Sequence, residues 1–221
     1  SARAGVAALN LTDLAKGLAD VSAAAAEIAG VEIKGLTSDS RRVAPGFLFA
    51  ALPGAKADGR SFIADALARG AVAVLGPAGV EWPATGRAAR LLTGNTRRAY
   101  ALMAARFHAR QPKTVCAVTG TNGKTSSVHF LRQIWAALGY RAAGIGTLGV
   151  IGADGRIAPS GGLTTPDPAE LHRLLKDLAL GGDRGDAAQR YEEHRRPGGP
   201  VQLAGDDAPD LAALVGRRPH Q

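Results

Sequence analysis

The chain contains a single cysteine, Cys116, among its 221 residues. One thiol cannot build a disulfide framework, and the apolar surroundings of Cys116 in the sequence predict a buried, inert side chain. The sequence also lacks any run of 18 apolar residues, so we expect no membrane span. Ser1–Gly5 does not combine a basic start with an apolar block. We therefore expect no secretory signal and a cytoplasmic location.

Aromatic residues are scarce as well, at 5% of the chain. The net charge of +8 raises nucleic acid as a partner, because basic surfaces attract phosphate backbones. However, the basic excess is spread along the chain, without a dense basic run and with little aromatic interleaving. We expect no nucleic-acid partner, and a mildly basic surface suited to phosphorylated substrates explains the charge equally well.

The most informative segment present runs from Val115 to Ser126 and reads VCAVTGTNGKTS. Apolar residues lead into glycines, then into Lys124 and Thr125, then into a helical pattern. This order predicts a strand, a phosphate loop and a helix, whose N-terminus adds partial positive charge. Lys124 would reach the β- and γ-phosphates, and the Thr125 hydroxyl would bind Mg²⁺.

The loop departs from the usual G-x-x-x-x-G-K-[ST] pattern, because Val118 stands where a glycine is expected. What remains is a shorter G-x-x-G-K-T built on Gly120 and Gly123. A chance Gly-Lys-Thr in an ordinary turn is the alternative interpretation. The agreement of the strand, loop and helix signals favours the phosphate loop.

Residues 1–110 alternate strand and helix signals and predict one α/β domain. We expect helices over Leu11–Asp20 with Asn10 or Thr12 as cap, from Ser61 as cap to Gly70, and from Asn95 as cap to Ala109, together with strands over Val31–Leu36, Phe47–Leu52 and Ala71–Leu75.

Gln111-Pro112 reads as a domain boundary, and residues 111–180 predict the start of a doubly wound parallel sheet. Strands are expected over Thr114–Val118 and Arg141–Gly146. The helix between them should bury Val128, Leu131, Trp135 and Leu138, and a second amphipathic helix should cover Pro168–Leu180. Residues 181–221 lack Ile, Phe, Met and Trp, so we expect a disordered tail.

Three groups of residues resemble the Mur ligases of peptidoglycan synthesis, over roughly residues 9–180. The first is Gly35–Arg41 with Pro45–Gly54 and Ala57–Ile63, similar to the family's UDP-binding domain. The second is Thr119–Ser126, similar to its ATP loop. The third is Gly146–Gly149 with Leu163–Pro168, similar to its muramoyl-peptide segment. The Thr-Thr-Pro-Asp-Pro run favours the ligases that add the third residue of the stem peptide. The first group also fits those that add D-Ala-D-Ala.

The resemblance implies roles for individual residues. ATP would be bound by Gly120, Thr121, Asn122, Gly123, Lys124, Thr125 and Ser126, with Lys124 as the catalytic residue and Thr125 on Mg²⁺. The UDP-linked substrate would contact Ser38, Ser40, Ala55, Lys56, Ala57, Thr164 and Thr165. Simpler interpretations exist: Ser38 and Ser40 as a polar turn, Lys56 as a solvated lysine, and Thr164 and Thr165 as a helix cap. His129, His172 and His194 receive no role.

The resemblance further implies an ATP- and Mg²⁺-dependent amide ligase acting on UDP-N-acetylmuramoyl-L-alanyl-D-glutamate and a diamino acid, meso-diaminopimelate above all. The fold implied is an N-terminal mixed α/β UDP-binding domain followed by the start of a P-loop ATPase domain. We expect a monomer. The family's later Glu-x-Ser-Ser-His-like motif, carbamylated lysine and C-terminal domain do not follow Leu180, so we expect an inactive fragment whose tail reflects a truncation or a changed reading frame.

Two other classes remain open. One is a non-enzymatic module that binds nucleotide or UDP-sugar. The other is a different P-loop ATPase or kinase, which requires an acidic residue at the end of a later apolar strand. The tail contains no such residue in that context.

Overall fold

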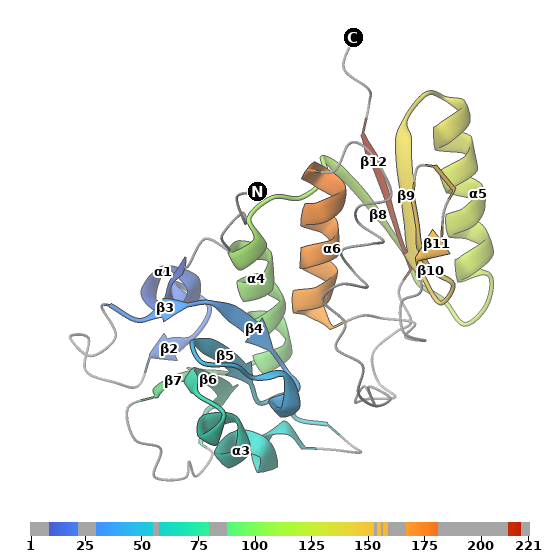
Figure 1. Cartoon of the computed structure of the whole chain (residues 1–221). Helices are drawn as coiled ribbons and strands as arrows, with labels where there is room; N and C mark the ends of the chain where they lie inside the picture. The colour runs from blue at the N-terminus through green and yellow to red at the C-terminus, as the bar shows by residue number, and fades with distance from the viewer. Residues whose placement is uncertain are drawn as a thin grey trace. The chain divides into compact units, whose positions relative to one another are not determined.

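The structure is a computed structural model that describes residues 9–21, 30–54, 58–79, 88–152, 154–155, 157–158, 167–180 and 212–217. The chain divides into two compact units, residues 1–107 and 108–221 (Figure 1). The α/β fold class expected from the sequence is confirmed. None of the helices described is both long and apolar enough to cross a membrane.

The first unit is built on a five-stranded sheet with the order β2-β7-β6-β5-β4. Four of its strands run parallel, and the edge strand β2 pairs with β7 antiparallel. A separate two-stranded ribbon pairs β1 with β3. The strands are β1 (Leu9–Asn10), β2 (Asp20–Val21), β3 (Glu32–Ile33), β4 (Gly35–Thr37), β5 (Phe47–Ala50), β6 (Ala71–Pro77) and β7 (Ala89–Thr93).

Two helices of this unit, α1 and α4, begin at the polar side chains that the sequence indicates. Asn10 accepts a hydrogen bond from the Thr12 amide at 2.8 Å and caps α1, and Asn95 accepts one from the Arg98 amide at 2.9 Å near the start of α4. Ser61 is not the cap that we expected. Asp58 accepts from the Arg60 amide and caps a 3₁₀ turn that leads into α3. The helical elements are α1 (Leu11–Ala15), η1 (Ser40–Arg42), η2 (Gly59–Phe62), α3 (Ile63–Ala68) and α4 (Thr96–His108).

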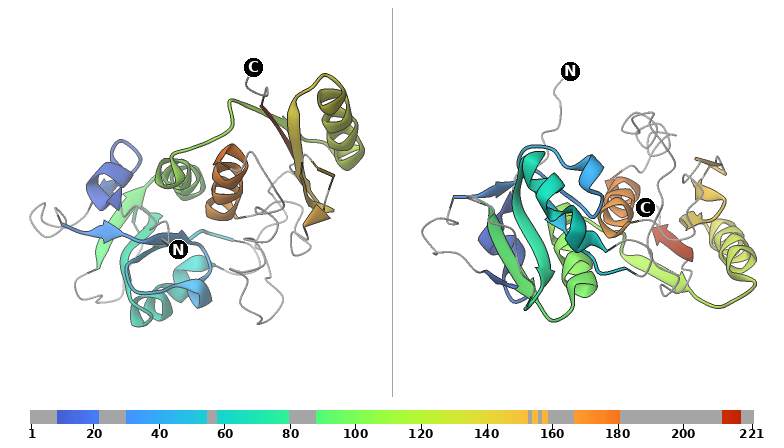
Figure 2. Two further views of the ribbon diagram at one scale, coloured as in Figure 1. Left: turned by 45° about the horizontal axis from the view of Figure 1, so that its top comes forward. Right: turned by 90° about the horizontal axis from the view of Figure 1, so that it is seen from below.

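The central strands of this sheet are covered on both faces, as Figure 2 shows. Phe49 and Val74 pack against Ile63 and Ala66 of α3. Because side chains alternate along a strand, the neighbouring Leu48 and Leu75 belong to the opposite face. Both are fully buried, and Tyr100 and Met103 of α4 are equally inaccessible. This two-sided burial explains why β5 and β6 read as continuous apolar runs.

Gly59 permits a close backbone approach near the end of β5. Its amide donates to the Leu52 carbonyl at 2.9 Å. A Cβ at this position would lie 2.6 Å from the Leu52 nitrogen and 2.7 Å from the Leu52 oxygen. Those atoms belong to the backbone and have little freedom to move away.

We predict that Gly59→Ala destabilises the protein by about 1–3 kcal/mol, the usual cost of forcing an extra methyl group into a packed site. The matched control is Gly94→Ala, because a Cβ at Gly94 meets nothing within 4 Å. The control should stay within about 0.5 kcal/mol of the parent. Urea unfolding measures both, and equal stability of the two variants would contradict the close approach.

The second unit contains a five-stranded sheet with the order β11-β10-β9-β12-β8. Its strands are β8 (Thr114–Val118), β9 (Arg141–Gly146), β10 (Gly149–Ile151), β11 (Ile157–Ala158) and β12 (Ala212–Arg217). The bounds of β8 and β9 are those expected from the sequence. Figure 1 shows β12 between β8 and β9. This strand differs from the disordered tail that we expected at these six residues, and the other tail residues lie outside the described part of the chain.

Two helices pack against this sheet, one on each face of β9. Val128 of α5 (Lys124–Ala137) packs with Ala142 of β9, and Cys116 of β8 lies against this cluster. Leu174 and Leu175 of α6 (Pro168–Leu180) pack with Ile145 and Val150. Ala142 and Ile145 are three positions apart on one strand, so they face opposite ways. The second unit therefore has a helix on each face of β9.

One expected core residue of α5 lies at the surface. Leu138 is 67% exposed, and Phe130 and Ile134 are also more than half exposed. Leu131 and Trp135, by contrast, pack against Val128 and Ala142 as the helical pattern predicted. The helix therefore carries apolar residues on two faces, and only one of them meets the sheet.

Candidate functional site

The turn from β8 to α5 is shaped by two glycines. Gly120 has φ of +142° and Gly123 has φ of +78°, and both values lie where side chains other than glycine are strained. A Cβ at Gly123 would meet nothing within 4 Å, so the constraint there is the dihedral angle rather than the space. The glycines therefore let the chain leave the strand and enter the helix within five residues.

The start of α5 has no side-chain cap. Gly123 is the N-cap, and no side chain caps the helix. The amide of Ser127 closes the first helical turn by donating to the Gly123 carbonyl at 2.8 Å. Amides at the start of a helix lack carbonyl partners within it and carry the positive end of the helix dipole. Such a terminus suits a phosphate group.

Lys124 lies over this loop. Its ammonium donates to the carbonyl oxygens of Gly120 and Thr121, the latter at 3.2 Å. Thr121 and Asn122 are exposed. The positive charge is thus held above the same loop whose glycines shape the turn. The chemistry of the arrangement is that of an anion cradle: backbone amides at a helix end and one mobile cation.

Thr125 makes a contact that the sequence did not reveal. Its hydroxyl oxygen lies 3.1 Å from that of Thr147, in the turn between β9 and β10. Thr147 lies in the Gly146–Gly149 segment that carried part of the resemblance, but we assigned it no role. The packing of α5 on β9 brings the two hydroxyls together, and the Gly-Thr-Leu-Gly turn was the sequence signal nearest to it.

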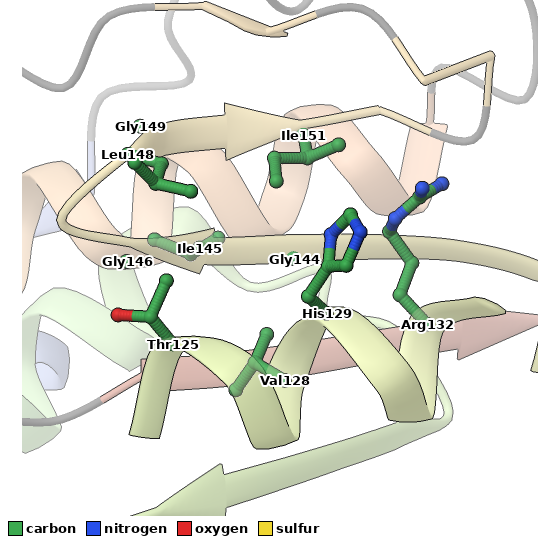
Figure 3. A pocket seen from close by; sticks show the side chains of 10 residues that line it. All are labelled: Thr125, Val128, His129, Arg132, Gly144, Ile145, Gly146, Leu148, Gly149 and Ile151. Atoms are coloured by element: carbon green, nitrogen blue, oxygen red, sulfur yellow. The ribbon is translucent and has the colours of Figure 1, made fainter. Parts of the chain in front are cut away.

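A pocket opens beside Thr125, between α5 and the β9–β10 hairpin (Figure 3). It is mainly apolar, and its only strongly polar side chains are His129 and Arg132. The His129 Nδ1 and Arg132 Nε atoms are buried and have no hydrogen-bond partner. The lining residues are Thr125, Val128, His129, Arg132, Gly144, Ile145, Gly146, Leu148, Gly149 and Ile151.

The polar atoms of this pocket are only partly paired. His129 Nε2 lies 2.7 Å from the Gln133 amide nitrogen, and an Arg132 terminal nitrogen donates to the Gly152 carbonyl at 3.4 Å. The cavity volume is about 20 Å³, which is enough for about one water molecule. We had assigned His129 no role. The structure places it in the wall of this pocket, on the same helix as Thr125.

In the first unit, Ser38 and Ser40 follow the carboxyl end of β4. Ser40 is buried, with 6% of its surface exposed, and Ser38 is half-buried. The pKa of Asp65 lies below its usual value. A hydrogen bond from the Ser40 side chain is the largest cause, and a hydrogen bond from Arg69 is the next. Ser40 therefore already has a carboxylate acceptor on α3, and its hydroxyl oxygen retains acceptor capacity for a ligand.

Between the two serines, Asp39 forms a fork with Arg41. The guanidinium donates to Asp39 Oδ1 at 2.9 Å and to Oδ2 at 2.8 Å, and the Arg41 amide adds a third bond at 3.0 Å. Burial alone would raise the pKa of Asp39, but these hydrogen bonds from Arg41 outweigh it and leave the pKa lowered. Asp39 thus stays ionised and fixes the turn that contains Ser38 and Ser40.

The other expected substrate residues, Ala55, Lys56, Ala57, Thr164 and Thr165, lie outside the described residues. Among the residues that are described, no group of three or more His, Cys, Asp or Glu side chains is arranged to hold a metal ion. The site residues expected from the sequence thus divide into a described loop at 120–126, a described serine pair at 38 and 40, and segments that the structure does not describe.

The family described as "Mur ligase family, catalytic domain" matches residues 32–108, and that described as "Mur ligase middle domain" matches residues 118–184. The chain belongs to the Mur ligase family.

Several Mur ligases are closely similar over the matched part. The UDP-N-acetylmuramoyl-L-alanyl-D-glutamate--2,6-diaminopimelate ligase of Rhizobium meliloti (strain 1021) is 54% identical over 153 residues, which are 69% of this chain and 31% of that protein. The enzyme of the same name from Mesorhizobium japonicum is 50% identical over 175 residues, 79% of this chain and 35% of that protein. The chain thus spans about a third of the length of these relatives.

A solved structure of a ligase with this same name agrees with the fold. It is 25% identical, has a TM-score of 0.58, and is matched over 79% of this chain and 34% of its own chain. The Mur ligase matches include the Ser38–Arg41 turn, the whole of loop 120–126, and α6. They end at residue 184, before β12, so this strand lies outside both family matches.

We predict that Ser40→Ala raises the pKa of Asp65 toward its ordinary value, because the carboxylate loses the hydroxyl donor that contributes most to its lowered pKa. Ser38→Ala is the matched control and should leave that pKa unchanged. NMR titration of the Asp65 carboxyl carbon measures both variants. An unchanged Asp65 in Ser40→Ala would show that the serine hydroxyl is not committed to this carboxylate.

Proposed function

We propose that this chain is part of an ATP-dependent ligase that joins 2,6-diaminopimelate to UDP-N-acetylmuramoyl-L-alanyl-D-glutamate. Relatives with this name are 50–54% identical to it over most of its length. The observation that carries the proposal is the loop at 120–126: a helix N-terminus capped by glycine, with the Lys124 ammonium above it. This arrangement is suited to the phosphates of a nucleoside triphosphate.

The proposed reaction forms an amide in two balanced steps. The D-glutamate carboxylate attacks the γ-phosphorus of ATP, which gives an acyl phosphate and ADP. The amine of the diamino acid then attacks the acyl carbon, inorganic phosphate leaves, and the nitrogen loses its proton. Most of the protein's task is to position the reactants and to stabilise charge on the transferring phosphoryl group.

Lys124 is our candidate for the charge-stabilising group. Its ammonium now donates to two neutral carbonyls, those of Gly120 and Thr121. A phosphate oxygen carries negative charge that a carbonyl oxygen lacks, so its Coulombic attraction to the ammonium should let it displace these carbonyls. The amides at the start of α5 would bind the same phosphate chain. Gly120 to Ser126 form the proposed ATP-binding segment.

Thr125 is the proposed Mg²⁺ ligand, and its surroundings fit that role. Mg²⁺ prefers oxygen ligands and usually keeps several waters together with substrate phosphates, so one hydroxyl from this segment is sufficient. Thr147 places a second hydroxyl 3.1 Å from that of Thr125 and can orient it. When bound, the ion would neutralise phosphate charge.

We propose that the nucleotide part of the UDP-linked substrate binds the first unit. Ser38, Ser40, Ala55, Lys56 and Ala57 are its proposed contacts, and Thr164 and Thr165, which belong to the second unit, are proposed contacts of the substrate's peptide end. The Asp39–Arg41 fork supports this because it fixes the turn on which both serines stand. A cytoplasmic location and a monomeric state also remain proposals.

We predict that Lys124→Ala weakens ATP binding about 10-fold or more, because hydrogen bonds to charged groups contribute about 1.5–3 kcal/mol. The matched control is Lys113→Ala, an exposed lysine of the same unit outside the loop. It should change affinity by less than about 2-fold, since surface changes seldom exceed about 0.5 kcal/mol. Titration of Mg·ATP, followed by chemical shifts of the Thr121–Ser126 amides, measures both. Equal affinities would rule out the phosphate loop.

Ligation is tested with a chimera that carries residues 9–180 of this chain in place of the matching part of the Rhizobium meliloti ligase. We predict that it consumes ATP and yields the diaminopimelate-containing product, detected by mass spectrometry. Lys124→Ala in the chimera should raise the activation barrier by several kcal/mol and so lower kcat, since the lysine contacts charge that develops in the transition state. A chimera that binds ATP without ligating would favour a non-enzymatic nucleotide-binding module.

A further inference from the structure

Strand β12 fills a gap of one strand in the second unit. It pairs antiparallel with β8 on one side and antiparallel with β9 on the other. β8 and β9 therefore run parallel to each other, and α5 connects them by crossing over the gap. Neighbouring strands lie about 4.8 Å apart, so β8 and β9 are about two such spacings from each other. An extended segment with free backbone groups fits between them.

The pairing is continuous on both sides. Residues 212–216 match 118–114 of β8, and residues 213–217 match 145–141 of β9. Leu214 stands opposite Cys116 on one side and Gly144 on the other. β12 is the sole strand partner that the described residues provide for β8. The backbone of the phosphate-loop strand thus joins the sheet through this segment.

The occupant lies outside the family matches. The middle-domain match covers residues 118–184, which include α5, β9 and the last residue of β8, whereas residues 212–217 lie beyond both matches. The occupant has no proline, and the nearest prolines are Pro209 and Pro219, outside the strand. Proline lacks an amide donor and is excluded from central strands, so this spacing suits a central position.

We propose that the gap between β8 and β9 is an acceptor site for an extended peptide, and that residues 212–217 of this chain occupy it and hold the phosphate-loop strand in the sheet. Recognition is by main-chain hydrogen bonds, as in other cases of strand addition. The side chains of the occupant are not what selects it, which explains how a segment outside the family matches can serve. The proposal holds whether or not the loop binds ATP.

The register gives a direct test in the full chain. Opposed residues of antiparallel strands have Cα atoms about 4.5–5.5 Å apart, within the range that a disulfide spans. Cys116 is the only cysteine, so Leu214→Cys creates one pair. The matched control is Val215→Cys, which stands opposite Val115 instead. Under mild oxidation, Leu214→Cys should form the intramolecular disulfide at least about 10-fold faster. Equal rates would overturn the assignment of the occupant.

A second test asks whether the occupant holds β8. Leu214→Pro removes one backbone donor from the centre of the strand, and Ala204→Pro is the control outside it. In Leu214→Pro, the Cys116 thiol should react with a maleimide at least about 10-fold faster than in the parent, and the amides of Thr114–Val118 should lose protection from hydrogen exchange. Ala204→Pro should match the parent, and the amides of β5 in the first unit should keep their protection in both variants.

Either of two results would overturn this part of the proposal. One is a Cys116 reactivity in Leu214→Pro equal to that in Ala204→Pro. The other is retained protection of β8, which would show that the strand is held by other contacts. The disulfide test does not depend on how well the proline variant folds, so the occupant is tested even where Leu214→Pro unfolds the second unit.

Discussion

The pairing of β8 with a neighbouring strand is the constraint on which the phosphate loop depends. Val118 ends β8 and Lys124 begins α5, so the loop between them is fixed at both ends. α5 in turn packs on β9 through Val128 and Ala142. The 3.1 Å contact between the hydroxyls of Thr125 and Thr147 joins the start of α5 to the turn that follows β9.

Local sequence signals predicted those elements whose limits are set by local chemistry. β8 and β9 end at glycine-containing turns, and α6 begins at Pro168, a residue that suits the first turn of a helix. Leu138 was placed in the core because helical spacing alone does not say how far the opposing sheet extends. β12 was missed for a different reason: the composition argument weighs apolar side chains, while a strand between two others is recruited by backbone hydrogen bonds.

Like the helices and strands, the residues of the candidate site were predictable only where the signal is local in the sequence. The residues of the loop could be named because glycines, Lys124 and Thr125 are consecutive in the sequence. Thr147, His129 and Arg132 could not be named, because the Thr125–Thr147 contact and the pocket that His129 and Arg132 line both depend on how the β9–β10 hairpin packs against α5. The contact between Ser40 and Asp65 likewise joins residues 25 positions apart. Sequence patterns rarely specify such contacts between side chains on different elements.

The proposed phosphate site would be preorganised by the glycine at the start of α5. A serine or aspartate at the N-cap would stabilise α5 by satisfying its first amides, and glycine gives up only a few tenths of a kcal/mol relative to such caps. Glycine instead leaves those amides without a competing side chain. Lys124 follows the same logic, because its two carbonyl acceptors are neutral and weaker than phosphate. An anionic oxygen could therefore replace either of these carbonyls at the Lys124 ammonium.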